Sequence, residues 1–503
     1  MSWDYSDSRK VRTLKEVIKF KLNIRRCPNK NCARYHKVYR PEAEGKYALP
    51  KHEFGLDIIA FCGELRYQEH RSVPQIHQQL RSRNINISQR SVTNLLNRYD
   101  ELISASLTDN QRLQQVLKEQ KYVILALDGL QPHVGHEVLW VIRDCISEEI
   151  LLTRSILSSS SAELELLIKE VKDFLPVRIE AVISDGQLSI RQAIKKTLPT
   201  AVHQLCHYHY LKEAIKPIME ADRHANKELK KLVRGVRPLE KSVENRDDTE
   251  ATCIKKYCSA VRSSLTDRGK PPLKVPGIKL QERLTKITNS LEKVKKKISL
   301  PHELIKLKQI LENALDKTKE FWPDLIQVYQ WIHTAAKILE NEEDLSAPLV
   351  RSRYFGLVGS MLRWKHQTKK LSEYIEHFHK ITVSYSSGLF HCYWVEGLPR
   401  TNNNLEQMFG SFRHHQRRCT GLKKAPSSTV VSGSSKIVAA IATKLKIFTA
   451  TDLAGVNLTL WRQKRQEVEK LRKSRLQQRN FRKDPDRYLM ELETELLQAI
   501  LPP

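Results

Sequence analysis

The chain has 503 residues, of which 40% are hydrophobic and 28% are charged, and glycine and proline are few. This composition is typical of folded proteins and excludes an intrinsically disordered chain. Lysine and arginine number 86 against 57 aspartates and glutamates, which gives a net charge of +29. Such an excess attracts polyanions, so nucleic acid is the expected partner. A ribosome-associated or membrane-surface protein is the alternative.

The length exceeds that of one ordinary domain and predicts several domains, or one large domain with insertions. No stretch approaches the ~20 apolar residues that cross a bilayer, and the first residues lack the apolar core of a signal peptide. Nine cysteines in such a chain indicate reduced thiols or metal ligands rather than disulfides. We therefore expect a soluble, intracellular protein that does not contact a membrane.

Residues 1–52 form a basic, irregular N-terminal region that contains the run CPNKNCARYH. In this run Cys27, Cys32 and His36 have a spacing that can place three ligands around one zinc ion. Tetrahedral zinc needs a fourth ligand, for which His52 and Cys62 are the candidates. The spacing is not that of a common zinc finger, so reduced thiols without metal remain the alternative.

Residues 53–105 are predicted to form three helices, with Pro74 in the first turn of the second helix and Ser88 capping the third. This arrangement is typical of a helix-turn-helix domain, whose recognition helix would run from Ser88 to Tyr99. The residues expected to contact DNA are Gln89, Arg90, Thr93, Asn94, Asn97 and Arg98. An ordinary helical bundle is the alternative.

Residues 120–213 alternate apolar strands with amphipathic helices and predict a mixed α/β sheet. Two of these strands end in an aspartate followed by glycine: LALDG with Asp128, and VISDG with Asp185. Carboxylates at strand ends can hold the two Mg²⁺ ions that phosphodiester chemistry uses, and we expect Asp128 to bridge them. Asp-Gly is also a common turn pair, which is the structural alternative.

The remaining sequence is largely helical in pattern. Residues 214–385 are rich in Lys and Glu and predict an all-helical region, and residues 386–424 contain one helix, TNNNLEQMFGSFRHHQRR. Residues 425–503 combine a flexible linker, APSSTVVSGSS over 425–435, with a basic helical region. That region can grip phosphates without reading sequence, or can be a solvated charged helix.

Taken together, these motifs resemble those of DDE-type transposases of the insertion-sequence and Mutator-like branch. Asp128 and Asp185 match the family's first two acidic residues, and Cys206 and His209 in QLCHYHYLKE match its Cys-x-x-His signature. The Asn-rich start of TNNNLEQMF resembles the segment before the family's catalytic glutamate, which makes Glu406 the third carboxylate. Glu396 is a nearby competitor. The resemblance covers 120–213 and 386–424 well, and the rest only in kind.

The resemblance implies an RNase H-like α/β core, a mixed sheet flanked by helices, that is interrupted by the all-α insertion. It also implies an N-terminal helix-turn-helix domain and a basic helical C-terminus. Asp128, Asp185 and Glu406 would bind two Mg²⁺ or Mn²⁺ ions. The spacing of Cys27, Cys32 and His36 separately suggests a structural Zn²⁺. Arg413, Arg417 and Arg418, on the helix of Glu406, would hold phosphates.

The implied activity is cleavage and strand transfer of double-stranded DNA, at the element's terminal inverted repeats and at a target. The protein would act as a homodimer or larger assembly on DNA, in a prokaryotic cytoplasm and associated with the nucleoid. Two alternatives stay open: a DNA-binding regulator that has lost catalysis, and an RNase H-like nuclease that does not transpose. Binding specific to the element's ends separates the transposase from the nuclease.

Overall fold

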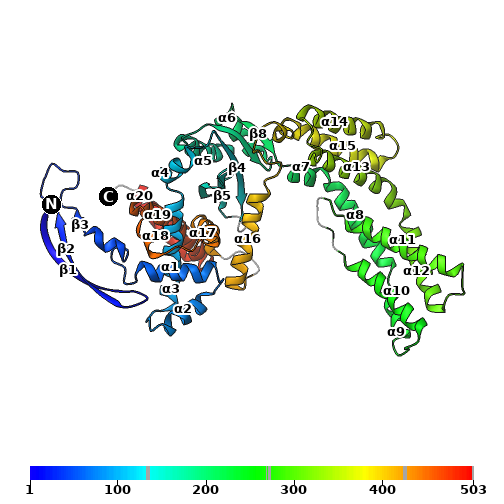
Figure 1. Ribbon diagram of the computed structural model, residues 1–503, viewed down its shortest axis with the longest axis horizontal. Helices are drawn as coiled ribbons and strands as arrows, with labels where there is room; N and C mark the ends of the chain where they lie inside the picture. The colour runs from blue at the N-terminus through cyan, green and yellow to red at the C-terminus, as the bar shows by residue number, and fades with distance from the viewer. Residues whose placement is uncertain (132–135, 268, 270–272, 423–426, 501–503) are drawn as a thin grey trace. The chain divides into compact units, whose positions relative to one another are not determined.

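The computed structural model describes residues 1–131, 136–267, 269, 273–422 and 427–500 (Figure 1). The chain divides into two compact units. The first unit contains residues 1–182, 187–201 and 402–503, and the second contains residues 183–186 and 202–401. No helix among the described residues combines the length and the apolar character that a membrane crossing requires.

A five-stranded sheet lies at the centre of the α/β region, as predicted. Its order is β6-β5-β4-β7-β8, and β5 runs antiparallel to both β4 and β6. Buried Val, Ile, Leu and Trp side chains of the strands pack against α4, α5 and α6. The bounds are β4 (Val123–Leu130), β5 (Val138–Asp144), β6 (Ile150–Ile156), β7 (Ile179–Ser184), β8 (Val202–Leu205), α4 (Asn110–Leu117), α5 (Ser161–Phe174) and α6 (Leu188–Thr197).

The N-terminal region is an antiparallel sheet, which corrects two expectations. The prediction of an irregular segment over 1–52 was wrong, and the chain begins with strands, not with a helix-turn-helix domain. The strands are β1 (Ser2–Arg12), β2 (Val17–Arg26) and β3 (Val38–Tyr39), followed by the short helix η1 (Glu42–Lys46). In β2 the apolar residues Ile18, Phe20, Leu22 and Ile24 alternate with exposed polar residues, which is a period-two signal that the prediction overlooked.

Three helices follow: α1 (Leu56–Tyr67), α2 (Val73–Ser82) and α3 (Gln89–Leu107). Ser88 caps α3 as predicted, since its side chain accepts a hydrogen bond from the Ser91 amide. The core of these helices is completed by C-terminal residues that include Ala439 and Trp461. The three helices are therefore one part of a larger packed unit.

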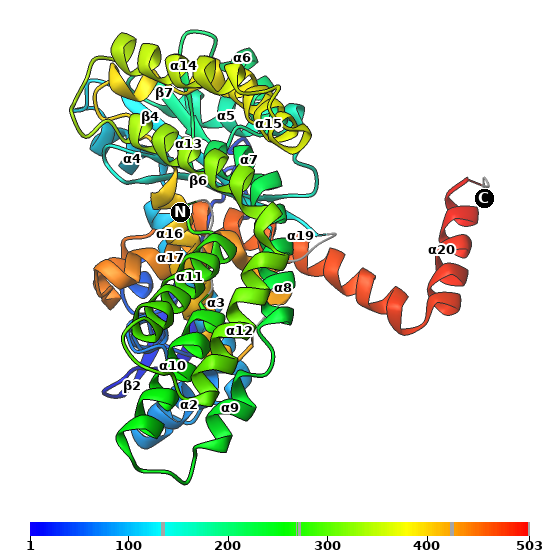
Figure 2. The ribbon, with the colours of Figure 1, turned by 90° about the vertical axis from the view of Figure 1, so that its right-hand side faces the viewer.

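The C-terminal part of the first unit consists of α17 (Ser427–Leu445), α18 (Ala450–Ala454), α19 (Leu458–Lys483) and α20 (Pro485–Ile500) (Figure 2). The prediction of a flexible linker over 425–435 was wrong for the described residues from Ser427 onward. Residues 423–426 lie outside the described residues. Val430 and Ser435 are buried in α17, which packs against α3 and the sheet. Small Ser, Thr and Gly side chains resemble a linker in composition, but they also let a helix approach its neighbours closely.

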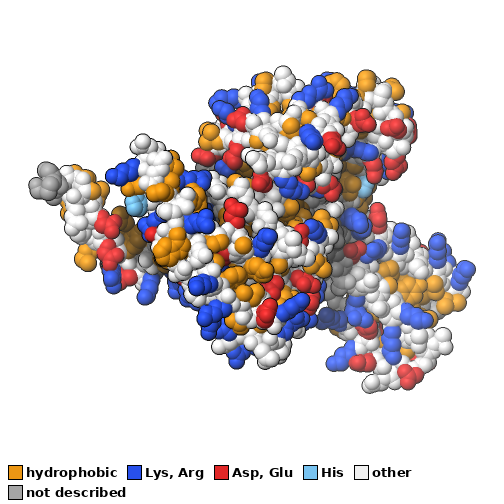
Figure 3. All heavy atoms as spheres, turned by 60° about the vertical axis from the view of Figure 1, so that its left-hand side comes forward, with side chains coloured by type: hydrophobic (Ala, Val, Ile, Leu, Met, Phe, Trp, Pro, Cys, Tyr) orange, Lys and Arg blue, Asp and Glu red, His pale blue; other side chains and the backbone are white. Residues whose placement is uncertain are grey.

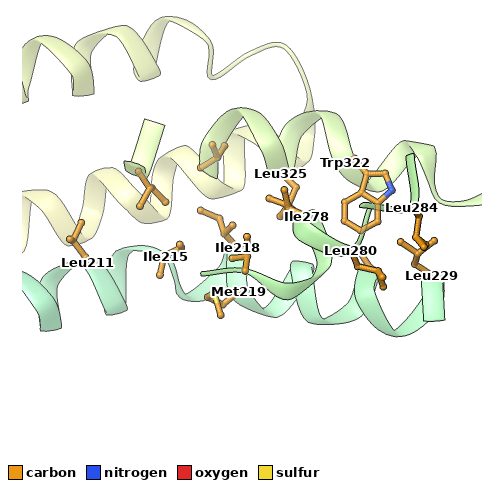
Figure 4. Packing of buried hydrophobic residues seen from close by; sticks show 14 of the residues in the cluster. Leu211, Ile215, Ile218, Met219, Leu229, Ile278, Leu280, Leu284, Trp322 and Leu325 are labelled. Carbon is orange, nitrogen blue, oxygen red and sulfur yellow. The ribbon is translucent and has the colours of Figure 1, made fainter. Parts of the chain in front are cut away.

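The second unit is largely helical, as predicted. Its helices are α7 (His207–Ala214), α8 (Lys216–Leu232), α9 (Val236–Ser242), α10 (Thr249–Thr266), α11 (Pro276–Lys295), α12 (His302–Lys317), η2 (Lys319–Phe321), α13 (Trp322–Glu340), α14 (Ala347–Arg363), α15 (Lys369–Tyr385), η3 (Ser386–Gly388) and η4 (His391–Tyr393). Figure 4 shows apolar side chains from several of these helices meeting in one core, among them Ile218, Ile278 and Leu325. This unit has a hydrophobic core of its own.

A buried carboxylate organises one corner of that core. The side chain of Asp222 on α8 accepts hydrogen bonds from the amides of Gly277 and Ile278, both at 2.8 Å. These amides belong to the first turn of α11, where amide groups have no partner within the helix. Asp222 is fully buried, so its carboxylate serves as the cap of a neighbouring helix.

We predict that Asp222→Ala lowers the free energy of unfolding by roughly 2–3 kcal/mol, because two buried amides lose their acceptor. Urea denaturation followed by circular dichroism measures the change. Glu220→Ala is the matched control, since Glu220 is exposed on the same helix, and it should leave the unfolding midpoint unchanged. Equal effects of the two substitutions would contradict the capping role.

Candidate functional site

Strand β4 carries Asp128 between two sheet neighbours. Residues Val123 to Leu127 are buried, whereas Asp128 is half-buried and pairs in register with Val141 of β5. Its Oδ1 accepts a hydrogen bond of 2.7 Å from the Gly129 amide. The sequence had suggested that the strand ends at Asp128. The strand continues to Leu130, so Asp128 lies within β4. The carboxylate is thus held on rigid, paired backbone.

Gly129 packs closely against β5. A Cβ atom at this position would lie 3.1 Å from Val138 and 3.2 Å from the ring of Trp140. A larger residue here would therefore need both side chains to shift by a few tenths of an ångström.

Helix α16 (Asn403–Thr420) carries Glu406 in its first turn. Its N-cap, Asn402, is buried, and its Nδ2 donates a hydrogen bond of 3.2 Å to the carbonyl of Leu127. Leu127 directly precedes Asp128, and the Glu406 amide donates to the Asn402 carbonyl at 3.3 Å. The start of the Glu406 helix is therefore fixed to the strand that carries Asp128. Glu396, the competing carboxylate, is exposed and lies outside α16.

Asp185 follows β7 directly and belongs to the second unit. Its neighbour Gly186 has a φ of +86°, a conformation that favours glycine. Within the same unit, the hydroxyl of Tyr385 on α15 donates to the Asp185 carbonyl at 3.2 Å, and the Cys206 amide donates to Ser184 at 2.8 Å. The helical region thus holds the backbone at the end of β7.

The Cys206–His209 run lies at the start of α7. Cys206 is the buried N-cap, and His209 is half-buried. Sequence reasoning passed over His207, which is buried and forms a 2.7 Å hydrogen bond with the Leu389 carbonyl. Burial lowers the pKa of His207 to about 4, although this hydrogen bond opposes the shift. A neutral His207 therefore ties α7 to the segment after η3.

The expected zinc ligands lie near one another in the N-terminal region, where the His36 amide donates to the Cys27 carbonyl at 3.3 Å. Among the described residues, three ligand atoms within 4.8 Å of one another are supplied by His70, His415 and Cys419, and not by Cys27, Cys32 and His36. The Arg34 amide and the Cys27 thiol both form hydrogen bonds with Cys32, and these bonds lower the pKa of the Cys32 thiol. Cys27 and Cys32 are therefore neighbours. His36, however, is exposed.

The two candidates for a fourth ligand have structural surroundings of their own. Cys62 is fully buried in α1, where burial raises its pKa to about 12. His52 lies against the ring of Trp461, with 6.3 Å between the centroids.

Sequence analysis missed the cluster of His70, His415 and Cys419. The i, i+4 spacing of His415 and Cys419 on one helix was a usable signal. His70 lies 345 positions before His415, and nothing in the local sequence connects the two.

Helix α3 exposes only part of the predicted contact set. Gln89, Arg90, Thr93 and Asn94 are exposed and Asn97 is half-buried. The inclusion of Arg98 was wrong, because its guanidinium forms a buried ion pair with Glu101 at 2.7 Å. The indole of Trp461 donates to the same carboxylate. Because α19 packs against α3, Arg98 is buried and its charge is paired within the protein.

A cavity of about 390 Å³ adjoins the exposed side of α3. Thr93 and Asn97 line it together with basic residues of other elements: Arg66, Lys436, Arg472 and Arg475. Elsewhere, Lys and Arg side chains are scattered among acidic and apolar ones over the face shown in Figure 3. Arg413, Arg417 and Arg418 are exposed on α16. The cavity therefore places polar side chains of α3 beside several cations and the carboxylate of Asp100.

We predict that stability falls as the pH drops from about 6.5 towards 4, because the unfolded chain binds a proton that native His207 resists. For this histidine the loss at pH 5 is about 2 kcal/mol. His207→Gln keeps a donor for Leu389 but does not titrate, so denaturation at pH 7 and pH 5 should show a smaller difference. His224→Gln, on the exposed face of α8, should retain the wild-type difference. The account fails if His207→Gln retains it too.

Residues 161–305 match the model of the family described as "Transposase, Mutator family". The matched range runs from α5 into α12 and contains Asp185 and the Cys206–His209 run, while Asp128 and Glu406 lie outside it. No curated protein matches the chain. The resemblance inferred from the motifs is confirmed over this range: the chain contains a Mutator-family transposase domain.

Proposed function

We propose that this chain, which contains a Mutator-family transposase domain, is a metal-dependent DNA transposase of the DDE type. The observation that carries the proposal is the hydrogen bond from Asn402 to Leu127. It ties the helix of Glu406 to the strand of Asp128, although the two segments lie on either side of the matched domain. We also propose that the five-stranded sheet and its helices are an RNase H-like core, interrupted by the helical region.

In this proposal Asp128, Asp185 and Glu406 are the metal-binding carboxylates. Each is half-buried, and the strands β4 and β7 that lead to the two aspartates are neighbours in the sheet. Carboxylate oxygens are the ligands that Mg²⁺ and Mn²⁺ prefer, so the donor set fits these ions. Two such ions, when bound, activate the attacking oxygen and stabilise the leaving oxygen.

The reaction has two phosphoryl-transfer steps. Water attacks a phosphodiester at the end of the element, which breaks the bond to the 3′ oxygen and leaves a free 3′-hydroxyl. That hydroxyl then attacks a phosphodiester of the target DNA, forming one bond and breaking another. The rigid supports of the carboxylates keep the reacting groups in place, and no covalent protein intermediate is needed.

DNA recognition is assigned to α3 and the cations beside it. The exposed residues Arg90 and Asn94 have the donors and acceptors that read guanine and adenine in the major groove. Arg472 and Arg475 line the adjoining cavity and are suited to phosphates. Arg413, Arg417 and Arg418 on α16 are proposed to hold phosphates near Glu406. Two or more copies of the chain would act on paired ends, as the family resemblance implies.

We predict that DNA containing the coding sequence of this chain and its flanking regions is cut in the presence of Mg²⁺ or Mn²⁺. Asp128→Asn, Asp185→Asn and Glu406→Gln should each lower the cleavage rate by about a thousandfold or more, because the carboxylates act as one unit. Glu396→Gln is the matched control and should cut normally. Gel analysis of the products measures the rate.

Other outcomes of this cleavage assay would support a different third carboxylate or a different function. Loss of cutting in Glu396→Gln but not in Glu406→Gln would move the third carboxylate to Glu396. Specific binding without any cutting by the wild type would favour a regulator. Cutting without preference for the flanking regions would favour a nuclease.

We predict that Asn94→Ala and Arg90→Ala each weaken binding to the element's ends by about 1–3 kcal/mol, roughly 5- to 150-fold. Binding to unrelated DNA should change little for Asn94→Ala, since that residue carries no charge. Arg237→Ala, an exposed residue of α9, removes the same charge as Arg90→Ala and should not reduce specificity. Fluorescence anisotropy with both DNAs measures the difference, and equal losses for Arg90→Ala and Arg237→Ala would contradict the assignment.

A further inference from the structure

Three metal-ligating side chains from distant segments meet within the first unit. His70 lies in the loop between α1 and α2, while His415 and Cys419 lie one turn apart on α16. The Nδ1 atoms of the two histidines are 2.8 Å apart. The sulfur of Cys419 lies 3.6 Å from Nδ1 and 3.5 Å from Nε2 of His415. One ligand atom from each of the three residues can be chosen so that all three atoms lie within 4.8 Å of one another.

These separations approach those of a zinc site. Zinc bonds of about 2.0–2.1 Å to nitrogen and 2.3 Å to sulfur, at tetrahedral angles, place ligand nitrogen and sulfur roughly 3.5 Å apart. The sulfur of Cys419 is nearly equidistant from Nδ1 and Nε2 of His415, so the His415 ring would have to turn for one of these nitrogens to share an ion with the sulfur. The two histidine nitrogens are at hydrogen-bonding distance and would separate by roughly half an ångström to share an ion. Rotation of the two imidazole side chains can supply this shift without movement of the backbone.

The backbone at His70 is held in an unusual conformation. Its φ is +56°, which non-glycine residues seldom adopt. The loop is fixed at Arg71, whose amide donates to the Leu65 carbonyl at 2.9 Å and whose carbonyl accepts a hydrogen bond of 3.0 Å from the Arg66 guanidinium. The fold thus holds His70 in a strained position from which its ring meets His415.

The two ligands on α16 are shielded from water. His415 is buried and stacks on Tyr67, with 4.8 Å between ring centroids. Cys419 is buried as well. A bound ion would displace the thiol proton of Cys419.

We propose that His70, His415 and Cys419 bind one divalent cation of the zinc class, with water at the fourth position. Two imidazoles and a thiolate suit zinc and exclude Mg²⁺, which takes oxygen ligands. The ion would join α16, the helix of Glu406, to the loop that precedes α2 and α3. The zinc ligands are different residues from the three carboxylates. The zinc proposal can therefore be tested separately from the proposed transposase activity.

Cobalt substitution tests the proposal, because Co²⁺ replaces zinc and is coloured. The full chain is purified, stripped with a chelator and titrated with Co²⁺ in the absence of DNA. We expect one equivalent to produce tetrahedral ligand-field bands and a thiolate-to-cobalt charge-transfer band. Cys419→Ser should abolish the charge-transfer band. His70→Asn, which suits the positive φ at this position, should weaken binding by more than about tenfold.

Two controls address other thiols. The double variant Cys27→Ser and Cys32→Ser removes the pair that the sequence suggested, and it should leave the bands unchanged. Cys392→Ser removes a thiol 4.0 Å from His207 and should also leave them unchanged. Circular dichroism establishes that each variant is folded, and His70→Asn decides the matter should Cys419→Ser not fold.

The proposal is overturned if no charge-transfer band forms in the wild type, if the band persists in Cys419→Ser, or if it disappears in the Cys27 and Cys32 variant. Full-strength cobalt binding by His70→Asn would also overturn it.

Discussion

The packing of the first unit depends on how the chain re-enters this unit at Asn402, after residues 202–401 have formed the helical region. Asn402 and Leu127 lie 275 positions apart, and the buried hydrogen bond between them fixes the return. Asn402 is buried, so losing the bond would remove a buried polar contact between the two segments. The interaction therefore determines where α16 begins, and with it the position of Glu406 relative to the strand of Asp128. The helical region has its own core, so its length need not disturb this closure.

The same closure explains why the C-terminal segment is integral to the first unit. After α16, the chain forms α17, whose Thr443 hydroxyl meets the buried hydroxyl of Tyr99 at 2.7 Å. Helix α19 then brings Trp461 to Glu101 and surrounds the buried Arg98. The helices proposed to read DNA and the helix of Glu406 thus share one packed body.

Local sequence patterns predicted much of this structure. The apolar runs around Asp128 and Asp185 predicted β4 and β7, and helical periodicity predicted most helices, because these elements bury one continuous face. Strand β2 alternates apolar and polar residues and could have been predicted, whereas β1 is largely polar and shows no such period. Serine-rich α17 was mistaken for a linker because composition does not report packing. The burial of Arg98 and the meeting of His70 with His415 arise from contacts between distant segments, which no local pattern encodes.

The central claim is that Asp128, Asp185 and Glu406 hold the catalytic ions, and cleavage by bound iron tests it most directly. Fe²⁺ replaces Mg²⁺ at carboxylate sites and, with ascorbate and peroxide, generates radicals that cut the nearby backbone. The protein is first saturated with Zn²⁺ so that iron does not occupy the histidine-cysteine cluster. The account predicts cuts close to residues 128, 185 and 406 that excess Mg²⁺ suppresses. Cuts beside Glu396 in place of Glu406, or a pattern that Mg²⁺ does not change, would contradict it.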